Sequence, residues 1–182
     1  MPRVPVRDVD DCPPESREAL EQLTKRMGGK TLNIFGGMAN SPAVINLYTS
    51  VEGTLGEYSS FDAGTRKAIH LTVANVNGCH YCQAAYTGGA KAAGFSEEQT
   101  LQIRSGHLDG DERFTALLGF AREIAGEKGH VSDATWNATL QAGWSEPELL
   151  DAFGEVIRTT LTNWFNHLVG TERDLPAAPP LD

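Results

Sequence analysis

The apolar residues of this chain recur at the spacing of an amphipathic helix, and this periodicity constrains the fold more than any other feature. The last long segment shows it best, because Ser145-Glu-Pro-Glu is an N-terminal helix signature that a stripe of large residues follows. That stripe comprises Leu149, Phe153, Val156, Thr160 and Trp164, and it is widened by Leu150, Ile157, Leu161, Phe165 and Leu168. No segment alternates apolar and polar residues between hairpin turns, so no strand is expected. The pattern predicts an all-α fold.

Capping residues and glycines divide the rest of the chain into further helices. We expect helices over about 14–27, 42–57, 62–77, 79–93, 96–104, 111–128, 132–142 and 145–169. No repeat or composition change marks a boundary, so one domain is expected over 1–182, with irregular tails at 1–14 and 171–182. The last helix is apolar over more than half its circumference, which indicates either central burial or a subunit interface.

The charge of the chain excludes two classes of partner. The formal net charge is −9 and the pI is near 5.0, whereas nucleic acids and anionic membranes select basic surfaces. No run approaches the roughly 18 apolar residues of a membrane span, and the first residues lack the apolar core of a signal peptide. A cytoplasmic location is therefore expected, with neither nucleic acid nor membrane as a partner.

The three cysteines provide the clearest chemical signal. Cys79 and Cys82 form a CxxC pair directly after Gly78, where a new helix is expected, and Cys12 stands apart between carboxylates and prolines. The unpaired N–H groups and the dipole of a helix N-terminus stabilise a thiolate. Such motifs lower a thiol pKa from about 8.5 into the range of roughly 3.5–7.5. Two sulfurs at this spacing can form and break a disulfide, so the pair indicates a redox site.

Two other interpretations of the pair stay open. A zinc site needs two further ligands, and neither a second CxxC nor an HxxxH motif accompanies the first. We therefore expect no metal and no cofactor. A structural pair is the stronger alternative, because buried cysteines are common in protein cores. We interpret Cys12 as incidental.

Several neighbouring residues can support a thiolate. Tyr86 shares a helix face with both cysteines, and its hydroxyl can bond a thiolate or a peroxide oxygen, unless it only fills the edge of the core. Lys67 and His70 lie on one stripe of the preceding helix. If that helix folds back, Lys67 can pair with the thiolate and lower its pKa, unless it is a solvated surface lysine. His70 is either a base or a buried structural histidine.

The segment Val76-Asn-Gly-Cys79-His-Tyr-Cys82 resembles the alkylhydroperoxidase D (AhpD)-like/carboxymuconolactone decarboxylase superfamily. The resemblance is most specific over about 62–94, and it extends loosely from about 31 to the ending Asp174-Leu-Pro176. It implies a bundle of about six to nine helices that assembles into homo-oligomers, often trimers or hexamers. It also implies that a CxxC pair acts on a small molecule and is then reduced by a thiol-disulfide protein or a small thiol.

The proton relay of the superfamily's peroxidases is replaced in this chain. Their glutamate position is Lys67, and their two histidine positions are Tyr81 and Tyr86. His80 is displaced by one residue and is expected to point about 100° away. Lysine and tyrosine titrate near 10.4 and 10 in model peptides, so they replace bases with hydrogen-bond donors. The resemblance implies that Cys82 attacks and Cys79 resolves, whereas the helix dipole alone favours Cys79 as the more acidic thiol.

These observations predict a thiol-dependent oxidoreductase of the AhpD-like type, with weak peroxidase activity or disulfide exchange. Cys79, Cys82, Tyr86 and Lys67 are the expected catalytic residues, supported by Tyr81, His70 and His80. Two alternatives remain: a non-redox lyase of the carboxymuconolactone decarboxylase type, and a redox-sensing or structural oligomer. The intact CxxC counts against the lyase, because members with that activity do not rely on one.

Overall fold

The computed structural model describes residues 1–181, and residue 182, the end of the expected C-terminal tail, lies outside them. These residues form helices and no strand, which confirms the predicted all-α fold. The helices are α1 (Pro14–Arg26), α2 (Asn33–Met38), α3 (Pro42–Tyr58), α4 (Ala63–Val76), α5 (His80–Ala92), α6 (Glu97–Ser105), α7 (Glu112–Gly126), α8 (Asp133–Gln141) and α9 (Glu146–Val169). All follow the expected segments except α2, whose short apolar sequence gave no helical signal.

Side-chain caps explain where most of these helices begin. Ser41, Asp62, Ser96, Ser132 and Ser145 each accept a hydrogen bond from a backbone N–H in the first turn of the helix that follows. At α6 and α9 the bond is reciprocal, because a glutamine or glutamate three residues on accepts from the N–H of the serine. Local sequence therefore sets the ends of these helices before any tertiary contact forms.

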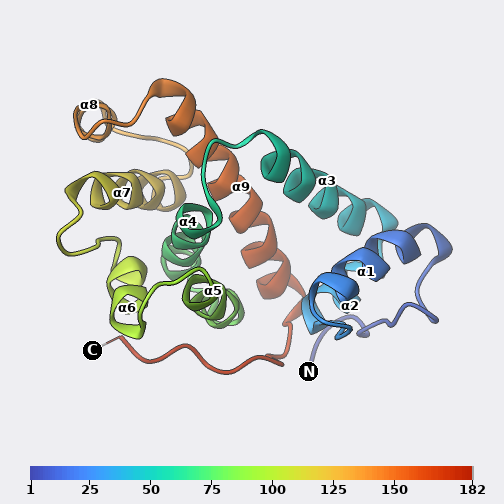
Figure 1. Cartoon of the computed structure of the whole chain (residues 1–182). Helices are drawn as coiled ribbons and strands as arrows, with labels where there is room; N and C mark the ends of the chain where they lie inside the picture. Colours follow the sequence, from blue (N-terminus) through green and yellow to red (C-terminus); the bar gives the residue numbers. More distant parts are fainter. Residues whose placement is uncertain (182) are drawn as a thin grey trace.

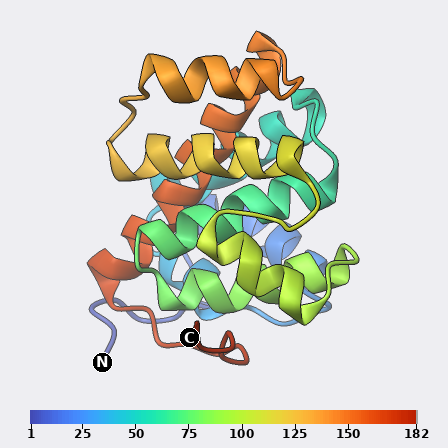
Figure 2. The same cartoon turned by 90° about the vertical axis from the view of Figure 1, so that its left-hand side faces the viewer.

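Helix α4 is the centre of the molecule. It packs against α5, α6, α7 and α9, and residues 68–74 are buried without a break, as expected of a helix surrounded by others. Helices α1, α2 and α3 cover one side of α9, while α6, α7 and α8 extend on the other side of α4 (Figure 1). Viewed at right angles, α8, α7 and α4 lie one below the other above α5 and α6 (Figure 2).

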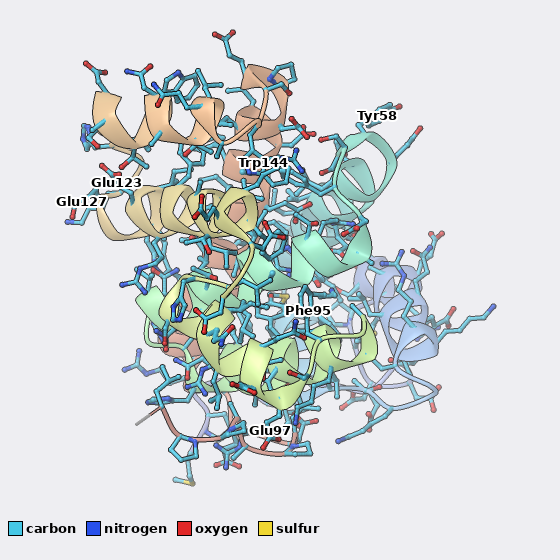
Figure 3. The ribbon with its side chains drawn as sticks, turned by 60° about the vertical axis from the view of Figure 1, so that its left-hand side comes forward. Tyr58, Phe95, Glu97, Glu123, Glu127 and Trp144 are labelled. Atoms are coloured by element: carbon cyan, nitrogen blue, oxygen red, sulfur yellow. The ribbon has the colours of Figure 1, made fainter. Side chains whose placement is uncertain are left out.

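Side chains divide between interior and surface as this packing requires. Phe95 and Trp144 lie between helices, whereas the carboxylates of Glu97 and Glu127 point outward (Figure 3). No helix within residues 1–181 carries an apolar stretch of the length that a bilayer demands.

Helix α9 is buried along one face, but this is not the face that the apolar stripe predicted. One face packs on α3, α4, α5 and α7 and contains polar residues, including the fully buried Glu155 and Asn163. Phe153 and Trp164, which the sequence placed in the main apolar stripe, are 46% and 63% exposed. The polar residues lie inside because they bond to one another and to other helices, which removes most of their desolvation cost.

The C-terminal tail returns across the start of α5. Asp174 accepts hydrogen bonds from the Tyr81 hydroxyl at 2.8 Å and from the backbone N–H of Asn33 at 3.3 Å, and it pairs with Lys30 at 3.3 Å. Farther along, the Arg104 guanidinium donates to the carbonyl of Pro179. The tail 171–181 has no helix or strand, yet these bonds fix its path along α5 and α6.

Candidate active site

The cysteine pair sits where the chain turns from α4 into α5. Gly78 has φ +66°, a left-handed conformation that glycine adopts without cost, and it ends the α4 turn. Cys79 is then the N-cap of α5, with its sulfur accepting a hydrogen bond from the backbone N–H of Cys82 at 3.3 Å. The prediction that the CxxC lies at a helix N-terminus is confirmed, with Cys79 at the cap itself.

The two sulfurs are in contact. Cys79 Sγ and Cys82 Sγ lie 2.7 Å apart, and both residues are almost completely buried. Asn166 of α9 donates from Nδ2 toward both sulfurs, at 3.1 Å to Cys82 and 3.8 Å to Cys79. The pair is therefore arranged for a disulfide to form with little movement and is held by donors that favour a thiolate.

The hydrogen bond between the two thiols shifts their acidity in opposite directions. The pKa of Cys79 is lowered, mainly by this bond and by the backbone N–H of Cys82, which donates to its sulfur. The pKa of Cys82 is raised by the same bond and by burial. This agrees with the expectation from the helix dipole that Cys79 is the more acidic thiol.

Access favours the other cysteine. Cys82, but not Cys79, lines a cavity of about 310 Å³ between α5, α9 and the N-terminal helices. The cavity volume is at the lower end of the range of about 300–1,000 Å³ that is usual for ligand pockets. Its walls are mostly apolar and are formed by Leu23, Arg26, Met27, Leu32, Ile34, Phe35, Tyr48, Glu52, Lys67, Tyr81, Cys82, Ala85, Tyr86, Gly89, Arg158 and Thr162.

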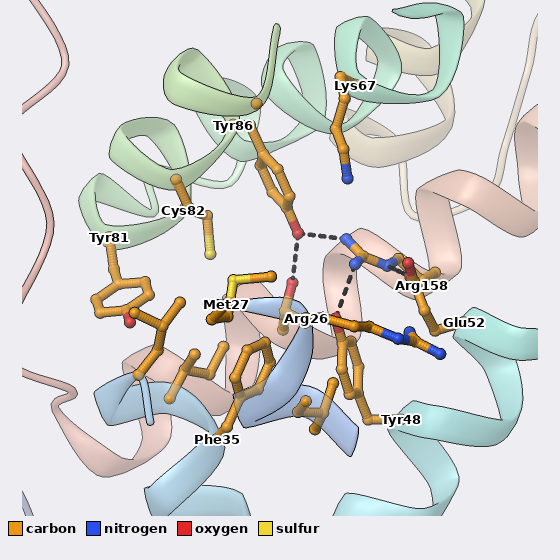
Figure 4. A pocket seen from close by; sticks show the side chains of 16 residues that line it. Arg26, Met27, Phe35, Tyr48, Glu52, Lys67, Tyr81, Cys82, Tyr86 and Arg158 are labelled. Atoms are coloured by element: carbon orange, nitrogen blue, oxygen red, sulfur yellow. Dashed lines mark hydrogen bonds and ion pairs between the residues drawn. The ribbon is translucent and has the colours of Figure 1, made fainter. Parts of the chain in front are cut away.

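Arg158 of α9 organises the polar end of this pocket (Figure 4). Its guanidinium donates to Glu52 at 2.6 Å, to the Tyr86 hydroxyl at 2.5 Å and to the Tyr48 hydroxyl at 2.8 Å. Burial, the largest single effect, raises the pKa of Glu52, but the nearby positive charges, led by Arg158, and the hydrogen bond from Arg158 together outweigh it, so the pKa is lowered. A charged pair and two phenols thus form the polar end of the pocket.

His70 belongs to a buried network behind the pocket. Its Nε2 lies 2.6 Å from Glu155, which Arg66 also binds at 2.5 Å, and its Nδ1 lies 3.5 Å from Arg158. Burial and the charge of Arg158 lower the pKa of His70 well below its ordinary value, so the ring is neutral. With both nitrogens engaged and no exposed surface, His70 matches the buried structural histidine that was one of its two interpretations.

Lys67 reaches the same pocket as Cys82 but not the sulfur. Its stem lies against Gly89, where an added Cβ would come within 3.2 Å of Lys67 Cδ. Among the described residues Lys67 has no ion pair or hydrogen bond, and neither sulfur has Lys67 as a partner. Burial and the charge of Arg158 lower its pKa. The pairing of Lys67 with a thiolate therefore stays a prediction, and no hydrogen bond among the described residues supports it.

The other predicted residues are placed differently from one another. Tyr86 lines the pocket, yet its hydroxyl is engaged by Arg158 and lies 3.2 Å from the Thr162 hydroxyl rather than contacting sulfur. Tyr81 lines the pocket and is tied to the tail, with its pKa raised by burial and by the bond to Asp174. His80 is exposed, and Cys12 is buried with its thiol directed to the carbonyl of Val9.

Sequence reasoning missed four residues that shape the site, namely Arg158 and Asn166 of α9 and Tyr48 and Glu52 of α3. A signal was present in the last helix. Glu155, Arg158, Thr162 and Asn166 recur at intervals of three and four within an otherwise apolar helix, which marks a polar stripe on one face. No group of three or more His, Cys, Asp or Glu side chains within residues 1–181 is placed to hold a metal ion.

A helical bundle that directs a CxxC pair from a helix N-terminus toward a pocket defines an all-α dithiol protein. Residues 42–123, from the start of α3 to within α7, match the carboxymuconolactone decarboxylase family, and this range includes both cysteines. This match, over the segment that contains the CxxC pair, confirms the resemblance to the AhpD-like/carboxymuconolactone decarboxylase superfamily. A search of curated protein sequences finds no match.

Solved structures agree on the fold. An alkylhydroperoxidase AhpD core protein of Ralstonia eutropha JMP134, described as an uncharacterized peroxidase-related protein, is 19% identical, with a TM-score of 0.84 over 96% of this chain and 93% of that one. A peroxidase-related protein of Silicibacter sp. TM1040 is 18% identical, with a TM-score of 0.76 over 93% and 88%. The debrominase Bmp8, in complex with 2,3,4-tribromopyrrole, is 13% identical, with a TM-score of 0.78 over 94% and 91%. These neighbours differ in activity, so the fold alone does not select one.

Proposed function

We propose that this protein is a thiol-dependent oxidoreductase that reduces hydroperoxides with Cys82 and Cys79. One observation carries the proposal: the only one of the two touching sulfurs that lines a pocket is Cys82, and Cys79 lies directly behind it at 2.7 Å. Access and proximity are what an attacking and a resolving thiol need.

The reaction balances with these two thiols and one external dithiol. The Cys82 thiolate attacks the terminal oxygen of the hydroperoxide, the O–O bond breaks, and the alkoxide that leaves takes a proton from water. Cys82 is then a sulfenic acid. Cys79 attacks the Cys82 sulfur, which forms the disulfide and releases water. A dithiol reduces this disulfide in two exchange steps and is itself oxidised to a disulfide.

In this scheme Cys79 is the more acidic thiol and Cys82 is the one that lines the pocket, and a proton transfer between them reconciles the two observations. The pair shares a proton across 2.7 Å, and Asn166 donates to both sulfurs, so negative charge on either is stabilised. Transfer of that proton from Cys82 to Cys79 produces the thiolate that faces the pocket. Tyr81 and Tyr86 stand at the two histidine positions of the superfamily's relay, and their hydroxyls are already bonded to Asp174 and Arg158. Because these hydroxyls are not free to move protons to and from sulfur, we expect slow turnover.

The proposal includes a setting. A reducing compartment, the cytoplasm, keeps such a pair as dithiol between turnovers, and a thiol-disulfide protein or a small thiol supplies the electrons. A homo-oligomer, such as the trimer or hexamer implied by the resemblance, would cover the exposed apolar side chains of α9. Neither a cofactor nor a metal takes part.

The test is a titration with tert-butyl hydroperoxide in a Cys12→Ser background. We expect one equivalent of peroxide to remove two thiols and to give a Cys79–Cys82 disulfide by mass spectrometry. A dithiol should then restore both thiols. Cys82→Ser should leave Cys79 unoxidised at the same peroxide concentration, whereas Cys79→Ser should stop at a sulfenic acid on Cys82 that a dimedone reagent traps.

The variants also separate the alternatives. Oxidation of Cys79 in Cys82→Ser, with none of Cys82 in Cys79→Ser, would reverse the assigned roles. A pair that resists both peroxide and dithiols would refute the oxidoreductase and leave the lyase. A disulfide that forms but that no reductant opens would favour the sensing or structural oligomer.

A further inference from the structure

The pocket beside Cys82 carries positive charge that the carboxylates of residues 1–181 do not fully neutralise. Three cationic side chains line it, Arg26, Lys67 and Arg158, against one carboxylate, Glu52. Glu52 is already bound by Arg158 at 2.6 Å. Among the described residues Lys67 and Arg26 have no ion pair, in a chain whose net charge is −9. An uncompensated cationic hollow in an acidic protein attracts anions.

The charge and the sulfur occupy opposite ends of the pocket. In Figure 4, Lys67, Arg26 and Arg158 gather at one end, and Cys82 with Tyr81 lies at the other. Lys67 packs on Gly89, which is seven residues after Cys82 on the same helix. Seven residues of α-helix correspond to about 10 Å along its axis. The intervening wall is apolar, with Leu23, Ile34 and Phe35 opposite α5.

We propose that the natural ligand of this pocket is an apolar molecule with one anionic group, most simply a medium-chain carboxylate. Its carboxylate binds Lys67, its hydrocarbon body lies on Phe35 and its neighbours, and its far end meets Cys82. That this far end is a hydroperoxide rests on the proposed function. The burial that lowers the pKa of Lys67 also strengthens its bond to an anion, because both occur away from bulk water.

The placement of Lys67 supports this ligand over the thiolate as its partner. Gly89 leaves room for the lysine stem at the cationic end, and the ammonium has no contact with either sulfur. Each guanidinium nitrogen of Arg158 already donates to Glu52, Tyr48 or Tyr86, so Arg158 is held in place and shapes the charged end. Lys67 is therefore the residue that distinguishes an anionic from a neutral ligand.

The first test measures binding without chemistry. Isothermal titration calorimetry with octanoate and with octanol should show octanoate binding about tenfold or more tightly to the wild-type protein, since one charge-assisted hydrogen bond has about this effect. Lys67→Gln should abolish the preference, and Lys67→Arg should retain it. Lys25→Gln is the matched control, because it removes one exposed lysine of α1 that does not line the pocket. Circular dichroism establishes that each variant is folded.

The second test compares the oxidation of Cys82 by a medium-chain ω-hydroperoxy acid and by its methyl ester. The acid should react faster by a similar factor, and Lys67→Gln should remove the difference. Three results would each overturn the inference. They are equal affinity for octanoate and octanol, no binding of octanoate, and a preference for octanoate that survives Lys67→Gln. If octanoate binds as expected but neither hydroperoxide oxidises the pair, the proposed function fails and the anionic preference stands. If the acid and the ester oxidise the pair at equal rates, the proposed function stands and the anionic preference fails.

Discussion

Arg158 shows how one residue decides the character of the site. It is almost completely buried, and each of its three guanidinium nitrogens donates to a carboxylate or a phenol of α3 or α5. A buried charge of this kind is tolerated only when its partners are in place, so Arg158, Glu52, Tyr48 and Tyr86 constrain one another. Within residues 1–181, the rigid polar end that results leaves Lys67 as a half-buried cation without an ion pair.

Asn166 is the residue expected to set thiol acidity. Asn166→Ala removes the side-chain donor that both sulfurs share, so the lower thiol pKa of the pair should rise by about one unit, equivalent to about 1.4 kcal/mol. Alkylation by iodoacetamide across pH in a Cys12→Ser background measures it. Below the wild-type pKa the variant should react more slowly, because less of the pair is thiolate.

Lys67→Ala provides the comparison. Because no hydrogen bond joins Lys67 to sulfur, its removal should raise the thiol pKa less than Asn166→Ala does. A larger rise would show that the lysine pairs with the thiolate after all, as the sequence alone suggested.

At the scale of the element, the start of α5 depends on one left-handed residue. Gly78→Ala places a side chain at φ +66°, where there is open space but an unfavourable backbone conformation, so the variant should lose about 1–2 kcal/mol of unfolding free energy. Gly88→Ala is the matched control. Gly88 is exposed within α5 with equal open space, and there alanine should stabilise by up to about 1 kcal/mol. Urea denaturation of both variants measures the difference, and similar effects would contradict the role given to Gly78.

At the scale of the molecule, the outer face of α9 has no partner within the described chain. Leu150, Phe153, Ile157, Trp164 and Leu168 are exposed along it, although the inner face is buried against four helices. A helix can present apolar residues on two faces only if something covers the second face. The proposed homo-oligomer supplies that cover.

Trp164→Glu should therefore shift the protein to a smaller species, because a charge in a buried interface is strongly disfavoured. Light scattering after size-exclusion chromatography measures the mass. Leu181→Glu, which alters an exposed apolar residue of the tail, should leave the mass unchanged. A wild-type monomer, or a Trp164→Glu variant of unaltered mass, would contradict the proposed interface.

The helices and the position of the cysteine pair follow from local sequence. Caps, glycines and apolar spacing act between residues a few positions apart. The helix boundaries at Ser41, Asp62, Ser96 and Gly78 can therefore be predicted from the neighbouring sequence. Helix α2 is the exception, because its six residues have neither a side-chain cap nor a long enough stripe to be recognised.

Tertiary structure alone decided what surrounds the sulfurs. Arg158 meets Glu52 across 106 residues and Asn166 meets Cys82 across 84, and no local pattern specifies such pairings. The same packing turned Phe153 and Trp164 outward and placed Arg158, rather than a thiolate, at the Tyr86 hydroxyl. It also put Lys67 in a pocket where no group of residues 1–181 forms an ion pair with it. Helical spacing says which residues share a face, but only the contact between helices says which face is buried and what it meets.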